Sequence, residues 1–190
     1  SYYETERLQL RIITSSYAAE VLNFYERNKN FFNYWEPDRV RLFYTKDFQR
    51  ANLVYEYNET VKLHFLRFWI FEKSNPEHII GCVCFQNLQK GSLMTCTVGY
   101  KLDQDYVGYG YASESLEKAV EVVFNDLNFH RIEALIHPMN APSIHLIEKL
   151  GFEFEGIAKS CIRLNNKWTD HLRYALTVSY THLRAHETDQ

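Results

Sequence analysis

The sequence of 190 residues has no run of 18 apolar residues, so it offers no membrane-spanning helix. It holds only four cysteines, and none forms the Cys-x-x-Cys knuckle that a zinc site prefers. We therefore expect no metal site, and reduced, buried thiols in a cytoplasmic protein. A basic excess is also missing, since 21 Lys and Arg stand against 24 Asp and Glu. The chain thus lacks the basic face that nucleic-acid binding requires.

Aromatic residues, by contrast, are abundant: 14 Tyr, 13 Phe and 3 Trp can fill a sizeable core. The length fits one domain. We place this domain at residues 1–177, because residues 178–190 resemble the in-frame translation of a transposon-type sequencing adapter. We expect that tail to be read-through and leave it out of the interpretation.

Hydrophobic periodicity predicts an α/β domain with a mixed central sheet. The expected strands span residues 6–12, 63–72, 78–87, 93–102, 131–137, 152–159 and 172–177, and the expected helices span 17–28, 46–59, 111–125 and 140–149. Short turns join the strands between residues 63 and 102, which predicts an antiparallel meander followed by a strand-helix-strand unit. Residues 30–41 are expected to be irregular, because Trp35-Glu-Pro37 interrupts any helix there.

Two glycines, Gly108 and Gly110, stand between the end of a predicted strand and the start of a predicted helix. Free backbone N–H groups at such a helix N-terminus bind phosphate. The glycine pair alone is a weak signal, because a plain turn has the same composition. A dinucleotide-binding fold needs a third glycine where Ser113 stands, and more chain after the loop than remains. A Walker loop is excluded, because no Gly-Lys-Ser/Thr follows.

A second signature lies further on: Asn140-Ala-Pro-Ser143, then Glu148-Lys-Leu-Gly151-Phe152, then Glu155-Gly156. Together the two signatures resemble the GNAT acetyltransferases, whose loop pattern is Gln/Arg-x-x-Gly-x-Gly/Ala. Further segments resemble the RimJ/RimL branch of ribosomal-protein N-acetyltransferases, and RimJ the more closely: residues 6–11, 35–39, 79–81, 130–132, 158–159 and 168–171.

This resemblance implies a GNAT fold whose central sheet splays after the strand ending near Leu102 to bind acyl-CoA, with acetyl-CoA as co-substrate. The pantetheine arm would pair with the backbone of Tyr100, Lys101 and Leu102. Backbone N–H groups would hold the pyrophosphate along Val107, Gly108, Tyr109, Gly110, Tyr111 and Ala112. Asp105 departs from the family pattern, because it stands where Gln or Arg is usual. It removes a side chain near the pyrophosphate and adds a negative charge.

The resemblance also implies direct transfer of the acetyl group to a primary amine in a ternary complex. The expected acceptor is the N-terminal α-amine of a ribosomal protein that starts with Ala or Ser. One alternative is a small amine, such as a polyamine, an amino sugar or an antibiotic. Another is a CoA-binding module without turnover, which Asp105 would favour. Neither nucleic acid nor a membrane is an expected partner, and a monomer and a homodimer both fit.

The expected catalytic residues are Ser143 and Asn140. Ser143 would relay a proton to the CoA sulfur or stabilise the thiolate by hydrogen bonding, and a second capping hydroxyl is an equally good interpretation. Asn140 would bond the pantetheine or an ordered water, and capping of the helix is an equally good interpretation. Tyr100 and Tyr109 are rival acids, although tyrosines are so common here that packing is the plainer role.

The acceptor cleft is expected between two segments, one with Trp35, Glu36 and Arg39 and the other with Trp168, Asp170 and His171. Glu36 would receive the charged amine, or is an ordinary loop carboxylate, and Trp168 fits core packing equally well. No base is assigned among His137, His145 and His171. An amine with a pKa of about 8 needs only a water relay.

Overall fold

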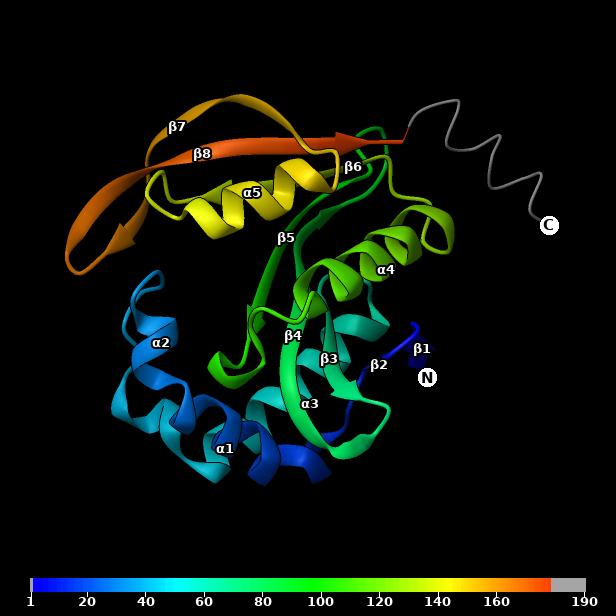
Figure 1. The fold of residues 1–190 in the computed structure, drawn as a ribbon, viewed down its shortest axis with the longest axis vertical. Helices are drawn as coiled ribbons and strands as arrows, with labels where there is room; N and C mark the ends of the chain where they lie inside the picture. Colours follow the sequence, from blue (N-terminus) through cyan, green and yellow to red (C-terminus); the bar gives the residue numbers. More distant parts are fainter. Residues whose placement is uncertain (1, 179–190) are drawn as a thin grey trace.

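A mixed sheet of eight strands forms the centre of residues 2–178, the part of the chain that the computed structural model describes (Figure 1). The strands are β1 (Tyr2–Glu4), β2 (Leu8–Arg11), β3 (Leu66–Glu72), β4 (Asn75–Gln89), β5 (Thr95–Leu102), β6 (Arg131–Ile136), β7 (Glu153–Leu164) and β8 (Lys167–Thr177). The α-helices of this range are α1 (Ala18–Arg27), α2 (Lys29–Asn33), α3 (Lys46–Val61), α4 (Tyr111–Asn125) and α5 (Ala141–Lys149). None of these helices is long and apolar enough to cross a membrane. Residues 179–190 of the expected tail lie outside the described residues.

The order of the strands is β1-β2-β3-β4-β5-β6-β8-β7, and every neighbouring pair except β5 and β6 is antiparallel. The predicted meander is β3, β4 and β5, and the predicted strand-helix-strand unit is β5, α4 and β6. Two parallel neighbouring strands need a crossover connection of about a dozen residues or more, such as α4, because a tight turn joins only antiparallel strands. The expected α/β domain with a mixed sheet is confirmed.

The structure contains two elements, β1 and α2, and a longer β7–β8 hairpin that the sequence pattern does not predict. β7 and β8 form one long hairpin, and because no residue of β7 is fully buried, its sequence has little apolar alternation to detect. α2 occupies the start of the segment expected to be irregular, and it ends before the Trp-Glu-Pro loop. β1 has three residues, too few for a periodic signal.

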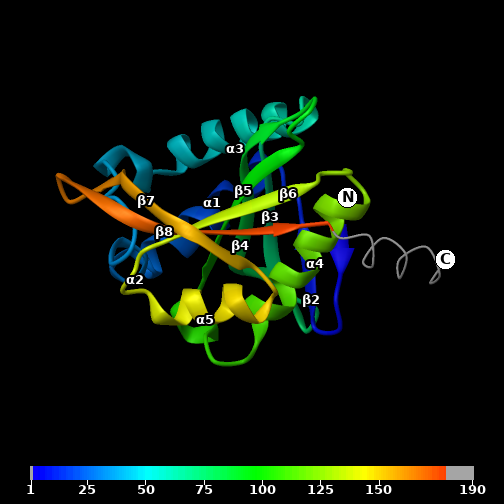
Figure 2. The ribbon, with the colours of Figure 1, turned by 90° about the horizontal axis from the view of Figure 1, so that it is seen from above.

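Two hydrophobic cores hold the helices against opposite faces of the sheet. Figure 2 shows α3 over one face and α4 and α5 over the other. Alternate residues of β3 supply both cores, because successive side chains of a strand point to opposite faces. Phe68 and Ile70 pack in the core that includes α4, while Trp69 and Phe71 pack in the core that includes α1. Each such buried side chain stabilises the fold by about 1.5–3 kcal/mol.

The sheet splays between its only parallel strands. β5 pairs with β6 from Thr95 to Thr97, and no pairing of these strands continues beyond that point in the described residues. β6 pairs over its whole length with β8, which leads it away from β5. The splay therefore opens at Val98, earlier than the expected position near Leu102. It leaves one backbone edge of β5 free from Val98 to Leu102.

Gly81 sets the spacing between β4 and the end of β5. A Cβ at this position would lie 2.5 Å from the carbonyl oxygen of Lys101, closer than real Cβ atoms come to backbone. It would also lie 3.2 Å from the side chains of Ile70 and Leu102. The missing side chain thus allows β5 to lie where the splay requires it.

We expect Gly81→Ala to destabilise the fold by about 1–3 kcal/mol, the usual cost of forcing volume into a packed position. Gly99→Ala is the matched control on β5, since its Cβ would meet the Cys84 sulfur at an ordinary 3.5 Å. Urea unfolding followed by circular dichroism measures both variants. Equal unfolding midpoints for wild type and Gly81→Ala would show that β5 shifts without cost, contrary to this expectation.

Candidate active site

A cavity of about 310 Å³ lies where β5 and β6 separate. Its wall is built by β4, β5, the end of β6, α5, the β7–β8 hairpin and the loop after α2, and it includes Trp35, Glu36, Tyr100, Lys101, His137, Asn140, Ser143 and His171. Segments from the first and last quarters of the chain thus meet at the splay.

Tyr100 and Ser143 form a hydroxyl pair inside this cavity. The Tyr100 hydroxyl lies 2.8 Å from Ser143 Oγ, and either group can donate. Burial raises the pKa of Tyr100 above its ordinary value, while the hydrogen bond to Ser143 acts in the opposite direction. Tyr100 therefore stays protonated at neutral pH, and the pair has a proton to give.

Asn140 is both a helix cap and a cavity residue. The backbone N–H of Ser143 donates to Asn140 Oδ1 at 3.3 Å, which makes Asn140 the N-cap of α5. The amide also lines the cavity. The capping interpretation is confirmed, and a contact of this amide with the cofactor stays a prediction.

Aromatic and imidazole rings line the far end of the cavity. The Trp35 ring lies 5.2 Å from His137, and His137 lies 5.5 Å from His171, between ring centres. Burial lowers the pKa of His171 below its ordinary value, and the hydrogen bonds of its neighbourhood do not reverse this. His171 is therefore neutral at pH 7.

Lys101 faces away from Tyr100, as the alternation of β5 requires. Its Nζ lies 3.3 Å from Glu36 Oε1, and only 12% of the side chain is exposed. Arg39 Nη2 lies 3.4 Å from the same oxygen. Sequence analysis singled out the backbone of Lys101 and missed this ion pair, because nothing local links β5 to the Trp-Glu-Pro loop.

The predicted phosphate loop has the geometry of an open helix N-terminus. Gly110 is the N-cap of α4 with a φ of 82°, and Gly108 has a φ of 86°, a region that favours glycine. Gly110 has no side chain to cap the helix, so the first N–H groups of α4 stay free for a ligand. The pKa of the Tyr111 hydroxyl is raised above its ordinary value, first by its 2.7 Å hydrogen bond to Glu72 and second by burial.

Arg7 lies beside this helix N-terminus, and sequence reasoning did not single it out. Its Nε donates to Glu114 Oε1 at 2.8 Å, and Thr5 donates to Oε2 of the same carboxylate at 2.5 Å. The Arg7 guanidinium lies 4.5 Å from the centre of the Tyr111 ring. A Cβ at Gly110 would come within 3.4 Å of Arg7 Nη2, so a cation adjoins the loop.

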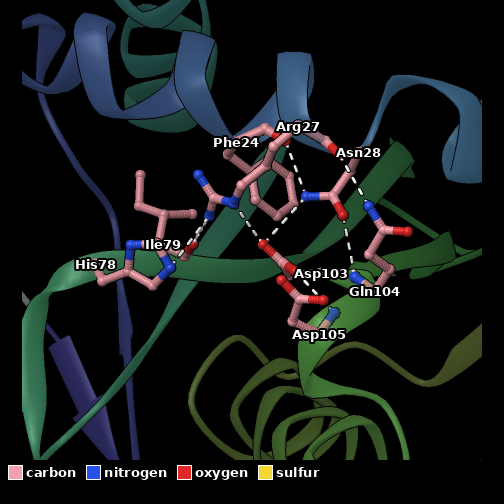
Figure 3. Close-up of polar contacts among 8 residues, drawn as sticks. All are labelled: Phe24, Arg27, Asn28, His78, Ile79, Asp103, Gln104 and Asp105. Atoms are coloured by element: carbon pink, nitrogen blue, oxygen red, sulfur yellow. Dashed lines mark hydrogen bonds and ion pairs between the residues drawn. The ribbon is translucent and has the colours of Figure 1, made fainter.

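A buried carboxylate, Asp103, ties the start of the loop to α1 (Figure 3). Its Oδ2 accepts from Arg27 Nε at 2.6 Å and from Asn28 Nδ2 at 3.2 Å. Its Oδ1 accepts from the N–H of Asp105 at 2.9 Å. Burial alone would raise the pKa of Asp103, but these three hydrogen bonds outweigh it and hold the pKa below its ordinary value of 3.8.

Arg27 and Asn28 extend the same network in both directions. Asn28 Oδ1 accepts from the N–H of Gln104 at 3.0 Å, and Gln104 Nε2 donates to the Arg27 carbonyl at 2.9 Å. Arg27 Nη2 donates to the carbonyl of Ile79 in β4 at 2.5 Å. Helix α1, strand β4 and the loop entrance are thereby fixed to one another.

Three of the expected acceptor residues do not line the reaction cavity. Arg39 lines a neighbouring polar cavity between α2 and the tip of the β7–β8 hairpin. Trp168 is 63% exposed near that tip, so core packing is wrong for it. Asp170 accepts a hydrogen bond from the N–H of Ser160 at 2.7 Å. The longer hairpin accounts for the positions of Trp168 and Asp170, because it runs past the cavity.

All four cysteines are free thiols. Cys82, Cys84 and Cys96 are buried free thiols, as expected, and Cys161 is partly exposed. Within residues 2–178, no three His, Cys, Asp or Glu side chains are grouped so that they could hold a metal ion.

The chain is similar to known acetyltransferases over most of its length. A family model described as an acetyltransferase (GNAT) domain matches residues 7–153. A probable N-acetyltransferase of Bacillus subtilis, YjcK, is 36% identical over 155 residues, 81% of this chain and 84% of the relative. The ribosomal protein uS5-alanine N-acetyltransferase of Escherichia coli is 33% identical over 176 residues, 92% of this chain and 89% of the relative.

Solved structures share the fold. The ribosomal-protein-S5-alanine acetyltransferase of Vibrio fischeri superposes with a TM-score of 0.88 at 30% identity, over 93% of this chain and 96% of that one. Other acetyltransferases with this fold, all less than 25% identical, are complexes with CoA or acetyl-CoA.

We expect Asp103→Asn to lower the free energy of unfolding at pH 7 by about 2–4 kcal/mol, because it leaves the partly buried Arg27 without its charge partner. The folded-state pKa of Asp103 is lowered, so its stabilisation is complete above 3.8 and is lost as the pH falls through the folded value. The difference between variant and wild type should therefore shrink below pH 3.8.

Asp47→Asn is the control for this variant, since Asp47 pairs with Arg50 at 3.0 Å but is 93% exposed. Exposed pairs contribute little, so this change should leave the unfolding curve nearly unchanged. Urea titrations at several pH values compare the three proteins. An Asp103→Asn curve that coincides with wild type at pH 7 would contradict the role given to the buried carboxylate.

Proposed function

The chain belongs to the GNAT family of acetyl-CoA-dependent N-acetyltransferases, and we propose that its acceptor is the N-terminal α-amine of a ribosomal protein. The observation that carries this proposal is the similarity to the two S5-alanine acetyltransferases, which extends over more than nine-tenths of the chain. It includes the loop after α2 and the β7–β8 hairpin, the segments that flank the acceptor side.

The surroundings of the cavity support a peptide acceptor. Beyond the Trp-Glu-Pro loop lies a second, open cavity of about 580 Å³, lined by residues of α2, by Arg39 and by Asn165 of the hairpin tip. Asn33 and Asn165 line this cavity, and their side-chain amides can donate to and accept from a peptide backbone. A small amine has no use for such a surface, whereas a protein N-terminus brings several residues with it.

On the donor side, the free edge of β5 gives the pantetheine arm backbone partners from Val98 to Leu102. The open N-terminus of α4 offers its N–H groups to the pyrophosphate, and Arg7, paired with Glu114 of the first helical turn, lies next to them. The thioester then lies near Tyr100 and Ser143.

Acetyl transfer in this arrangement is a direct displacement. The neutral amine nitrogen attacks the thioester carbonyl carbon, a C–N bond forms, and the C–S bond breaks. The nitrogen gives up a proton and the sulfur gains one, so that CoA leaves as the thiol. We assign the proton donation at sulfur to the Tyr100–Ser143 pair, whose hydroxyls share a hydrogen bond. Asn140 positions Ser143 by capping the same helix turn. Trp35, Glu36 and His171 form the acceptor wall.

Mass spectrometry of acetyl transfer tests the acceptor. Wild-type protein and acetyl-CoA are offered peptides that start with Ala or Ser, the same peptides with a blocked N-terminus, and a panel of small amines. We expect acetylation of the free α-amines and none of the blocked peptides. Acetyl groups found only on small amines would make the protein a metabolite or drug acetyltransferase. Binding of acetyl-CoA without any transfer would favour the binding module.

We expect Ser143→Ala and Tyr100→Phe each to lower kcat by about 10²-fold, the usual contribution of a positioned acid, while acetyl-CoA affinity changes little. Because the two hydroxyls act in one relay, the double variant should lose no more than either single variant. Steady-state kinetics at saturating acetyl-CoA measure the three proteins. If the fold-losses in kcat of the two single variants multiply in the double variant, the two hydroxyls act independently and the relay is wrong.

A further inference from the structure

The ammonium group of Lys101 lies beneath the acceptor side of the cavity, where the mechanism above gives it no role. Lys101 lines the cavity and is held by Glu36 at 3.3 Å. Burial alone would lower the pKa of this amine, but the pKa is raised above its ordinary value, and the charge of Glu36 is the largest cause that opposes burial. Lys101 is therefore charged at neutral pH.

The charges around Lys101 do not cancel. Glu36 Oε1 is shared by Lys101 and by Arg39, at 3.3 Å and 3.4 Å, so two cations face one carboxylate. Among the described residues that line the cavity, Glu36 is the only carboxylate. Lys101, Arg39 and Glu36 together carry a net charge of +1, and Lys29 and Asp38, which line the second cavity with Arg39, add one charge of each sign. The three side chains are at most 29% exposed, so screening of their charges by water is reduced.

The other titratable groups that face Lys101 leave this excess in place. Tyr25 of α1 and Cys82 of β4 are buried, and burial raises the pKa of both, so they stay neutral. Arg67 of β3 is neutralised by Glu56 of α3 through two hydrogen bonds of 3.1 Å. The remaining titratable residues of the cavity lining are Cys84 of β4, Tyr100 of β5, His137 after β6 and His171 of β8.

An amine must lose its proton before it can attack a thioester, and a free peptide α-amine has a pKa of about 8. A nearby positive charge disfavours the ammonium form and lowers the pKa of the amine. We propose that the excess positive charge held by Lys101 and Arg39 over the single carboxylate of Glu36 drives the bound acceptor amine into its neutral form. This proposal rests on the proposed function only in that an amine must enter this cavity.

Lys101 acts here as a positioning residue that works through charge, and no dedicated base is required. Water can carry the proton away, because the equilibrium already lies on the side of the neutral amine. Glu36 orients the amine but does not stabilise its ammonium form, because the carboxylate charge of Glu36 is already balanced by Lys101 and Arg39.

The test is the pH dependence of the single-turnover rate of acetyl transfer at saturating substrates, in wild type, Lys101→Met and Lys101→Arg. That rate follows the neutral fraction of the bound amine. In Lys101→Met we expect the apparent pKa of the acidic limb to rise by about one unit. The rate would then fall ~10-fold below that pKa and would meet the wild-type rate at high pH. Lys101→Arg keeps the charge and should keep the wild-type profile.

A purely structural role gives a different result. If Lys101 only holds the Trp-Glu-Pro loop, Lys101→Met lowers the rate by the same factor at every pH, and the proposal is wrong. Superimposable profiles for wild type and Lys101→Met overturn it as well. Should Lys101→Met fail to fold in a thermal melt, Lys101→Gln removes the same charge with a polar side chain and is judged by the same criteria.

The acceptor used is whichever class the wild type acetylates, so the two proposals fail separately. Acetylation of small amines alone refutes the ribosomal acceptor, and the same profiles recorded with the small amine still decide the role of Lys101. A wild-type protein that acetylates no amine at any pH overturns both.

Discussion

The structure depends on one incomplete pairing, the parallel contact of β5 with β6 that ends at Thr97. Backbone N–H and C=O groups inside a protein need partners, and a strand whose neighbour turns away leaves a row of them open. From Val98 onward β5 carries such an edge, and the cavity lies beside it. An extended ligand with amide groups can complete the sheet there. The chemistry of the site follows from this gap, because the strand that offers the edge also supplies Tyr100 and Lys101 to the wall.

Holding the gap open requires that β5 be fixed from its other side. Gly81 lets β4 approach the carbonyl of Lys101 closely, and Asp103 anchors the residues after β5 to Arg27 of α1. Strand β5 contributes to both sides of the site, because successive side chains of a strand point to opposite faces. Tyr100 points to the α5 face and meets Ser143, while Lys101 points to the opposite face and meets Glu36. A displacement of β5 would disturb the donor and the acceptor sides together, which explains why several tight contacts converge on its end.

Features with a local cause could be predicted from the sequence. The meander follows from turns and alternation, α4 begins at Tyr111 because two glycines precede it, and Asn140 caps α5 because its side chain can accept from Ser143. Contacts between distant segments could not be predicted. Arg27 and Asp103 are 76 positions apart, and in sequence each looks like an ordinary surface charge. The position of Trp168 away from the reaction cavity could not be predicted either, because an exposed hairpin has no hydrophobic periodicity that would reveal its length.

The number of positive charges differs between the two classes of acceptor, a polyamine and a peptide N-terminus. A polyamine brings several ammonium groups, and each one left unpaired in a partly buried site is costly. The wall offers one carboxylate within the described residues, Glu36, and two cations already share it. A peptide N-terminus brings a single charge that it must lose in order to react, and the rest of it is neutral amide. The proposed excess of positive charge would repel a polycation and would accept an α-amine, in agreement with the peptide acceptor proposed above.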